Sequence, residues 1–462
     1  MEPESGGSGL QEAGRRFIAQ AVARPLQSFI RTEAASGIIL LAGAIIALLW
    51  VNSPWDESYF DLWHQQLSID LAIFQVGGPL EFWVNDGLMA IFFFVVGMEI
   101  KRELAHGELS TVRRAALPAA AALGGMIVPA LIFTAFNAGG DGQRGWGIPM
   151  ATDIAFALGV LSLLGRRVPF GVKVFLLGLA IVDDIGAIVV IAVFYTEELA
   201  VGPGAWALAL LGAIVLANRG GVRNVYVYIV LGGLLWVAVL KAGIHPTIAG
   251  VVLGLLAPAR PFYSVRDFVS SAERVLALFR QAAAEEDTEV QAGALARMED
   301  LAQGTESPLD RLERGLHPWS SFLIVPIFAL ANSGVVLNGD ILGDAASSPI
   351  TLGVALGLVA GKLSGILGFA WLAVRSGMCD LPTGATWSHL AGAALLGGIG
   401  FTVAIFITGL AYDDPALVDE AKIGILAASL VAGVLGYLFL RTTTRPAPKA
   451  IPASPPGPGA AR

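Results

Sequence analysis

Long apolar runs separated by short polar breaks fill the chain from about residue 37 to residue 441. A bilayer core takes about 20 apolar residues per helix, so this pattern predicts an all-α membrane protein with about twelve transmembrane helices. The predicted spans are residues 35–51, 82–101, 115–137, 144–165, 172–195, 203–218, 223–240, 243–257, 317–335, 350–374, 386–411 and 420–440. The runs at 203, 223 and 243 are short and close together, so a count of about eleven would also fit.

The basic residues between the spans fall mostly on one side of the predicted membrane. One set of short loops holds Lys101, Arg102, Arg113, Arg114, Arg166, Arg167, Lys173, Arg219, Arg223 and Arg375. The alternate set holds only Arg144 and Lys241. Cytoplasmic loops are the ones enriched in Lys and Arg, so we predict that the first set lies in the cytoplasm. With an even number of spans, both termini lie there too.

Three segments differ from the spans. Residues 1–34 are polar and read as a cytoplasmic N-terminal segment, either an interfacial helix around RRFIAQAVARPLQSFI or a loose tail. Residues 258–316 hold seven Lys/Arg and eleven Asp/Glu, a net −4, and read as a charged, partly helical cytoplasmic linker. Residues 442–462 are rich in Pro, Ala and Gly, which predicts a disordered cytoplasmic tail. Spans one to eight then occupy residues 35–257, and spans nine to twelve occupy residues 317–441.

Composition excludes several classes of protein. The chain is 55% hydrophobic and 14% charged, whereas an ordinary soluble domain has roughly a quarter charged residues. A net charge of −8 argues against a nucleic-acid-binding protein, which needs a concentrated basic surface. Cys379 is the sole cysteine, so neither an intrachain disulfide nor a cysteine metal site is possible.

Four ionisable residues lie deep within predicted spans. Asp153 lies about 10 residues into its span. The chain then turns at the membrane surface, and Asp183 and Asp184 lie about 11 residues into the returning span. These three carboxylates should therefore meet near the midplane. Lys362 is about 12 residues into its own span and reaches the same depth. Ionisable groups at that depth are costly, so all four are functional candidates.

Two spans carry signals of an interrupted helix. Gly397, Gly398 and Gly400 fall in LLGGIGFTVAIF, and GWGIPMATDIAF leads into Thr152 and Asp153. Interrupted helices in separate halves of a chain are typical of transporters built from inverted repeats, with the ion site between them. Unwound backbone frees carbonyls for a cation, and the half-helix ends need charge compensation, for which Asp153 and Lys362 are placed.

The adjacent pair Asp183 and Asp184 indicates an ion site. A single intramembrane Asp can also be a structural hydrogen-bond acceptor, but neighbours on a helix point about 100° apart, so at least one should face water or an ion path. Carboxylate oxygens suit small hard cations, and partly desolvated carboxylates also bind protons near neutral pH. Competition between ion and proton at one site is the minimum machinery of an exchanger. Two protons against one monovalent cation would make exchange electrogenic.

Several motifs together resemble the NhaA sodium/proton antiporters of bacterial inner membranes. They are NDGLMAIFFFVVGMEIKREL, ATDIAFALGVLSLLG, LAIVDDIGAIVVIAVFYT, GIHPTIAGVVLGLLAP, LHPWSSFLIVPIFALANSGV and GGIGFTVAIFITGLA. The resemblance covers about Phe29 to Arg441 apart from the linker. It implies a fold with inverted repeats and two crossing discontinuous helices, a multi-pass protein of the inner membrane and a homodimer surrounded by lipid. It also implies a transporter rather than an enzyme, without cofactor or nucleic-acid partner, that exchanges Na⁺ or Li⁺ for H⁺ in sodium and pH homeostasis.

The resemblance also implies roles for the buried charges. Asp184 is expected to be the main Na⁺ ligand, with Asp183 beside it as the second ion-binding or proton-carrying carboxylate. Asp183 should pair with Lys362. Asp153 should balance the broken-helix ends, and Thr152 should line the site.

A second group of residues resembles the family's cytoplasmic funnel and pH-response positions. It comprises Glu99, Lys101, Arg102, Glu103, Glu313 and His317, with His245 matching more loosely. Asp86 is a further span acid in a family position. The alternative for the two histidines is a satisfied interfacial or core role, and the charges of MEIKREL could be only a solvated helix end.

The chain departs from the family pattern in two places. Lys362 sits in GKLSGI where GKPLGI is expected, so the local helix geometry there should differ. Arg314 occupies a position where histidine is expected, and the preceding linker is long. The family pattern therefore does not predict how activity depends on pH in this chain.

Two other classes of membrane protein fit less well. A passive cation channel would present a repeated filter or charged rings at a symmetry axis, and no such repeat is present in the sequence. An intramembrane aspartyl protease could use two membrane Asp residues as a dyad sharing one proton. We would expect a GxGD motif in such a protease, and none occurs.

Overall fold

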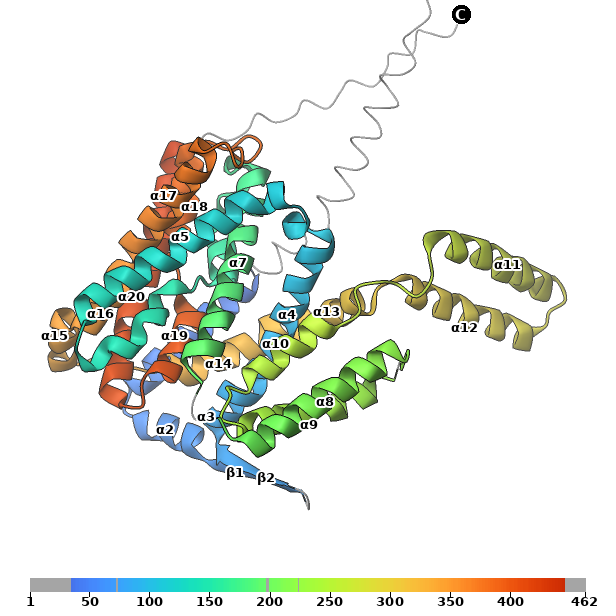
Figure 1. Cartoon of the computed structure of the whole chain (residues 1–462), viewed down its shortest axis with the longest axis horizontal. Helices are drawn as coiled ribbons and strands as arrows, with labels where there is room; N and C mark the ends of the chain where they lie inside the picture. Colours follow the sequence, from blue (N-terminus) through green and yellow to red (C-terminus); the bar gives the residue numbers. More distant parts are fainter. Residues whose placement is uncertain (1–34, 72–73, 197–198, 223, 445–462) are drawn as a thin grey trace, which may run out of the picture.

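The computed structural model describes residues 35–71, 74–196, 199–222 and 224–444. The predicted N-terminal segment and nearly all of the predicted tail lie outside these residues. The described chain is a helical bundle with a two-helix arm on one side and a β-ribbon at one end (Figure 1).

Every predicted span contains apolar helix. The membrane helices are Ala35–Val51, α4 Met89–His106, α5 Val112–Asn137, α6 Ile154–Leu163, α7 Phe170–Phe194, α8 Val201–Arg219, α9 Val225–Lys241, α10 Thr247–Leu256, α14 Val325–Asn332, α16 Pro349–Leu356, α17 Lys362–Arg375, α18 Trp387–Leu396, α19 Phe401–Ala411 and α20 Pro415–Thr443. Among the described residues, six helices are long and apolar enough to cross a bilayer, or nine if each of three bent pairs is one span. The all-helical class of the fold is confirmed, and the exact number of spans stays a prediction.

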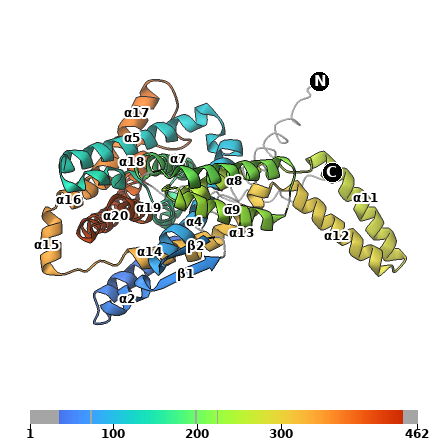
Figure 2. The ribbon, with the colours of Figure 1, turned by 60° about the horizontal axis from the view of Figure 1, so that its bottom comes forward.

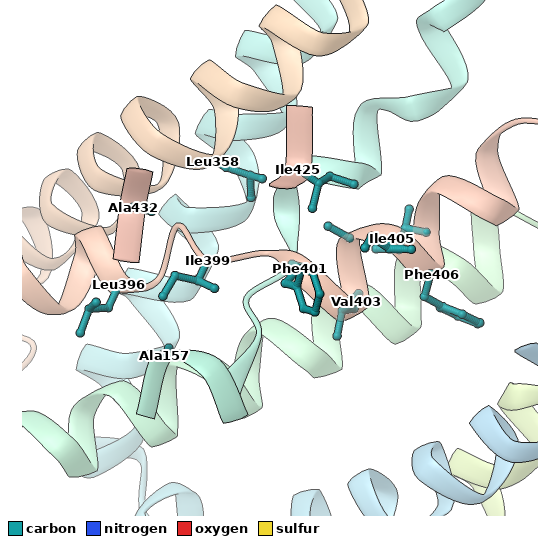
Figure 3. Close-up of a cluster of buried hydrophobic side chains, with 14 of the residues drawn as sticks. Ala157, Leu358, Leu396, Ile399, Phe401, Val403, Ile405, Phe406, Ile425 and Ala432 are labelled. Carbon is teal, nitrogen blue, oxygen red and sulfur yellow. The ribbon is translucent and has the colours of Figure 1, made fainter. Parts of the chain in front are cut away.

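Both predicted interruptions are present. The 3₁₀ helix η3 Asp141–Met150 and α6 bend by 45° at the break 151–153, and α18 and α19 bend by 46° at the break 397–400. The backbone N–H of Asp153 donates to the carbonyl of Ile399 across 2.7 Å, so the two breaks touch. Buried apolar side chains, among them Ile399 and Phe401, pack around the second break (Figure 3).

Glycines allow two pairs of helices to pack at backbone distance near the site. A Cβ on Gly124 of α5 would lie 2.1 Å from the carbonyl oxygen of Gly365 on α17. A Cβ on Gly250 of α10 would lie 2.1 Å from the carbonyl oxygen of Ala90 on α4. Small residues permit such close approach between membrane helices. Helices α17 and α4 are thereby fixed against the bundle, and they carry Lys362 and Glu99.

The segment between the first two spans contains structure that the apolar pattern did not predict. Here α2 Asp56–His64 is followed by an antiparallel ribbon of β1 Gln66–Leu71 and β2 Phe74–Pro79. The chain then enters α3 Leu80–Phe82 and the π-helix η1 Trp83–Leu88, which continues into α4. The six-residue strands are too short and too polar to stand out from a loop in the sequence.

The predicted linker folds as a helical arm. Helices α11 Val265–Ala284 and α12 Thr288–Thr305 pack on each other through a small core of Val275, Ala294 and Leu301. The arm extends away from the bundle in both views (Figures 1 and 2). Then α13 Pro308–Trp319 begins within the predicted linker and continues through the π-helix η5 Ser320–Ile324 into α14. Ser307 caps this helix, and Pro308 at its first position favours the early start.

Candidate ion-binding site

One carboxylate holds both half-helix N-termini at the crossing. Asp153 Oδ1 accepts from the backbone N–H of Phe156 (2.9 Å) in the first turn of α6. Its Oδ2 accepts from the backbone N–H of Thr402 (3.2 Å) and from the hydroxyl of the same residue (2.6 Å), at the start of α19. A helix N-terminus has unpaired N–H groups and partial positive charge, so a buried anion stabilises both ends at once.

The carbonyl end of α18 is satisfied from the other break. The hydroxyl of Thr152 donates to the carbonyl of Gly397 (2.8 Å). The N–H of Asp153 covers the carbonyl of Ile399. The two breaks are therefore hydrogen-bonded to each other, through Thr152 and Asp153, and both of these residues are buried.

Asp183 and Lys362 form a buried ion pair. The Lys362 amine donates to Asp183 Oδ2, and the exposed fractions of the two residues are 0% and 1%. A lysine on α17 thus reaches an aspartate on α7 in the middle of the bundle. The hydrogen bond that the structure gives Lys362 goes to Asp183, so a role for this lysine at the half-helix ends stays a prediction.

Asp184 faces a different environment from its neighbour. It lines a cavity together with Thr152, Asp153, Glu99, His317 and Thr402. The cavity offers about 60 Å³ to the centres of water molecules, and one water needs roughly 10 to 15 Å³ by that measure. Several waters or a partly hydrated cation can therefore stand beside Asp184. Asp183 does not belong to this lining, so the adjacent carboxylates are divided between an ion pair and a water-sized space.

Five of the predicted funnel residues pair with one another, and two of them, Glu99 and His317, line this cavity. His317 Nε2 lies 3.5 Å from Glu99 Oε1. Arg102 pairs with Glu313 and lies 3.7 Å from Glu103. Burial raises the pKa of the Glu313 carboxyl, and the Arg102 guanidinium acts against that shift. Residues of α4 and α13, far apart in sequence, thus form one charged cluster.

The remaining predicted residues lie apart from this cluster. His245 Nε2 lies 3.3 Å from Asp86 Oδ1 and its Nδ1 lies 2.8 Å from the hydroxyl of Thr247. The Lys101 amine donates to the carbonyl of Leu255 (2.6 Å). Arg314 pairs with Glu306 (2.5 Å), a hydrogen bond that raises the pKa of its guanidinium. Arg314 is therefore tied to the base of the arm and is mostly exposed.

Sequence reasoning missed two parts of the site. Thr402 was included only in a glycine-rich break, yet it supplies two hydrogen bonds to Asp153. Threonine directly after GGIGF, at a helix start, is the signal that could have indicated it. Ser320 and Ser321 also line the cavity, from a π-helical turn that no sequence pattern marks.

Within the described ranges, no group of three or more His, Cys, Asp or Glu side chains is arranged to hold a metal ion.

Comparison with known proteins places the whole membrane domain in one family. The family model described as Na⁺/H⁺ antiporter 1 matches residues 27–440. The Na⁺/H⁺ antiporter NhaA 2 of Syntrophotalea carbinolica is 47% identical over 420 residues, covering 90% of this chain and 96% of the relative. The Na⁺/H⁺ antiporter NhaA of an Anaeromyxobacter species is 50% identical over 445 residues (94% and 96%), and that of Wolinella succinogenes is 46% identical over 424 residues (91% and 93%). The chain therefore belongs to the NhaA family of Na⁺/H⁺ antiporters, membrane transporters rather than enzymes.

Proposed function

We propose that this chain is an electrogenic antiporter that exchanges one Na⁺ or Li⁺ for two protons by competition at midplane carboxylates. The observation that carries the proposal is the division of the adjacent pair: Asp184 borders the cavity, while Asp183 is bound to Lys362.

Competition follows from the chemistry of Asp184. A carboxylate in a narrow cavity binds either a small cation or a proton, because both occupy its oxygens and each neutralises its charge. Asp153 and Thr152 supply further oxygen atoms near this cavity. Entry of Na⁺ from one side therefore displaces a proton, and the reverse occurs on the other side.

The second proton is assigned to the Asp183–Lys362 pair. A buried pair survives only while both partners are charged or both are neutral, since a lone buried charge is costly. When Na⁺ binds at Asp184 and is also coordinated by Asp183, the Asp183 carboxylate no longer compensates the charge of Lys362. Lys362 then releases a proton. Two protons then move against one cation, and net charge crosses the membrane.

We further propose that the protein lies in the bacterial inner membrane with both termini in the cytoplasm. The positively charged set of loops supports this orientation. In the same orientation the cavity end at Glu99 and His317 opens toward the cytoplasm. Thiol labelling of single-cysteine variants at Arg113 and at Arg144, in sealed oriented vesicles, tests it: the two labels should come from opposite sides.

A homodimer surrounded by lipid is proposed as the working assembly. The two-stranded ribbon leaves strand edges unpaired within the described part of the chain, and such edges pair readily with another chain. Crosslinking of cysteines placed in β1, in native membranes, should give a dimer band, whereas a monomer under those conditions contradicts this assembly.

The exchange is tested with purified protein in liposomes. A Na⁺ gradient should drive proton movement, and a membrane potential should change its rate if exchange is electrogenic. Li⁺ should replace Na⁺. Sodium-driven proton movement that is insensitive to potential would leave an antiporter but contradict the two-proton stoichiometry.

A further inference from the structure

Ser320 places a buried hydroxyl on the wall of the ion cavity. The residue is 3% exposed, and it lines the cavity together with Asp184, Thr152 and Glu99. Among the described residues, this hydroxyl has no hydrogen-bond partner. A buried hydroxyl that makes no hydrogen bond is costly, so this one bonds to what the cavity holds, either water or an ion.

Other hydroxyls in the membrane helices bond within their own helix. The hydroxyls of Thr408, Ser162 and Ser364 donate to carbonyls three or four positions earlier, at 2.9, 2.7 and 2.6 Å. Serine and threonine commonly satisfy their hydroxyls in this way inside helices. Ser320 makes no such bond within the described chain, which leaves its hydroxyl for the cavity.

A π-helical turn begins at Ser320. This turn, η5, joins α13 to α14, and His317, Ser321 and Val325 of the same joined helix also line the cavity. Turns of this kind often occur at functional sites. Asp184 lies on α7, so a cation held by both Ser320 and Asp184 bridges two helices that are far apart in the sequence.

The size of the cavity requires a cation to use oxygen atoms of the wall. The space holds about four to six waters. A cation with its complete hydration shell would fill it, so the cation exchanges part of that shell for protein oxygens, the ligands that hard ions prefer.

Ser320 offers the cation an oxygen that the fold leaves unused. The hydroxyls of Thr152 and Thr402 are oriented by their bonds to Gly397 and Asp153. The Ser320 hydroxyl is free to rotate. It can therefore accept a cation through a lone pair, and it can donate to water when a proton replaces the cation.

We propose that Ser320 is a ligand of the transported cation and sets a preference for Na⁺ over Li⁺. This inference deepens the proposed exchange and rests on it. Li⁺ is the smaller ion and takes fewer ligands, so Asp184 and water complete its shell. Na⁺ takes more oxygens, and Ser320 supplies one without adding charge to a cavity that three carboxylates already line.

The first test removes the oxygen and compares the two ions in liposomes. Ser320→Ala should raise the Na⁺ concentration for half-maximal exchange about five- to tenfold and that for Li⁺ less than about twofold. The maximal rate should change little. Ser320→Cys keeps the size of the side chain but replaces the oxygen with sulfur, a poor ligand for hard ions, so it should behave like Ser320→Ala.

Ser162→Ala is the matched control. Its hydroxyl bonds within α6 and does not line the cavity, so this variant should keep the parent's values for both ions. A folded Ser320→Ala protein whose change is no larger for Na⁺ than for Li⁺ overturns the assignment. A lost hydrogen bond or a changed packing volume would not separate the two ions.

The second test measures binding without transport. Purified protein in detergent is titrated with radioactive Na⁺, with Li⁺ as the competitor. Ser320→Ala should bind Na⁺ about five- to tenfold more weakly, whereas Asp184→Asn should not bind it. If Ser320→Ala binds Na⁺ like the parent while the parent exchanges ions, the Ser320 assignment fails and the proposed function stands. If Ser320→Ala weakens binding but the parent exchanges nothing, the proposed function fails and the ligand stands.

Discussion

The helix crossing and the α11–α12 arm are both pairs of helical pieces joined by a short non-helical link, but they are held together in different ways. At the crossing, the link residues bond to residues about 245 positions away, as Thr152 does to Gly397. In the arm, the caps are local: Ser264 accepts from Asp267, and Asp287 accepts from Glu289 and Val290.

The difference reflects where each pair can find water. The turn of the arm is exposed, so its polar groups are solvated and its caps need little support. The breaks at the crossing are buried in the bundle, where an unsatisfied polar group is costly and must be matched by another segment. The crossing therefore joins buried polar groups of distant segments, whereas the exposed arm needs only local caps.

The largest effect is expected at Asp184. Asp184→Asn keeps the size of the side chain but cannot hold negative charge against a cation, so exchange should be abolished while the protein remains inserted. Sodium-driven proton movement in liposomes measures this. Activity like that of the parent would remove Asp184 from the ion site.

The next effect concerns the anion at the crossing. Asp153→Ala leaves the N-termini of α6 and α19 without their shared acceptor. Each lost cap costs about 1 kcal/mol, so the free energy of unfolding should fall by about 2 kcal/mol or more. Asp153→Asn keeps one of the two acceptor oxygens, without the charge, so stability should fall less than in Asp153→Ala. The matched local control is Asp287→Ala in the arm, which should cost one cap only. Equal losses at both positions would contradict the distinction between crossing and arm.

The Asp183–Lys362 pair should show coupling. Lys362→Ala leaves a buried carboxylate without its partner, at a cost of about 3 to 5 kcal/mol, and should reduce both stability and exchange. The double variant Asp183→Asn, Lys362→Gln should recover part of the stability. A double-mutant cycle by thermal unfolding measures this, and strictly additive losses would show that the pair contributes nothing jointly.

A smaller, pH-dependent effect is expected at Glu313. Burial raises its pKa in the folded protein, so the folded state holds this proton more tightly than the unfolded state. The parent should therefore lose stability relative to Glu313→Gln as the pH rises from the ordinary Glu pKa through the raised value. Unfolding followed across that window tests the sign, and a difference that does not change with pH would contradict it.

The smallest effect is expected for the arm. Deleting residues 265–303 should leave exchange intact, because the retained Tyr263 and Gly304 already lie side by side and can be joined by a short linker. The cost of loop closure changes by only about 0.6 kcal/mol for each doubling of length. A longer deletion that also removes Glu306 breaks the contact of Arg314 and serves as the comparison variant. Loss of exchange in a folded deletion variant would assign the arm to the mechanism.

Much of the fold was predictable because membrane insertion imposes simple rules. The positions of apolar helices, the two interruptions and the depth of the buried charges follow from run length and helical rise. The β-ribbon and the early start of α13 were not predictable, because they depend on short polar segments and on a local cap. The family resemblance supplied the roles of the charges, and these roles stay predictions.

By itself, the sequence determined that the chain is a helical membrane protein with carboxylates and a lysine at one depth, since the hydrophobic effect and the cost of buried charge act on any such sequence alike. Only the tertiary structure decided which charges meet. Depth gives one coordinate of a side chain, whereas pairing needs all three. The packing of α7 against α5, and of α5 against α17, brings Lys362 to Asp183 and leaves Asp184 to the cavity.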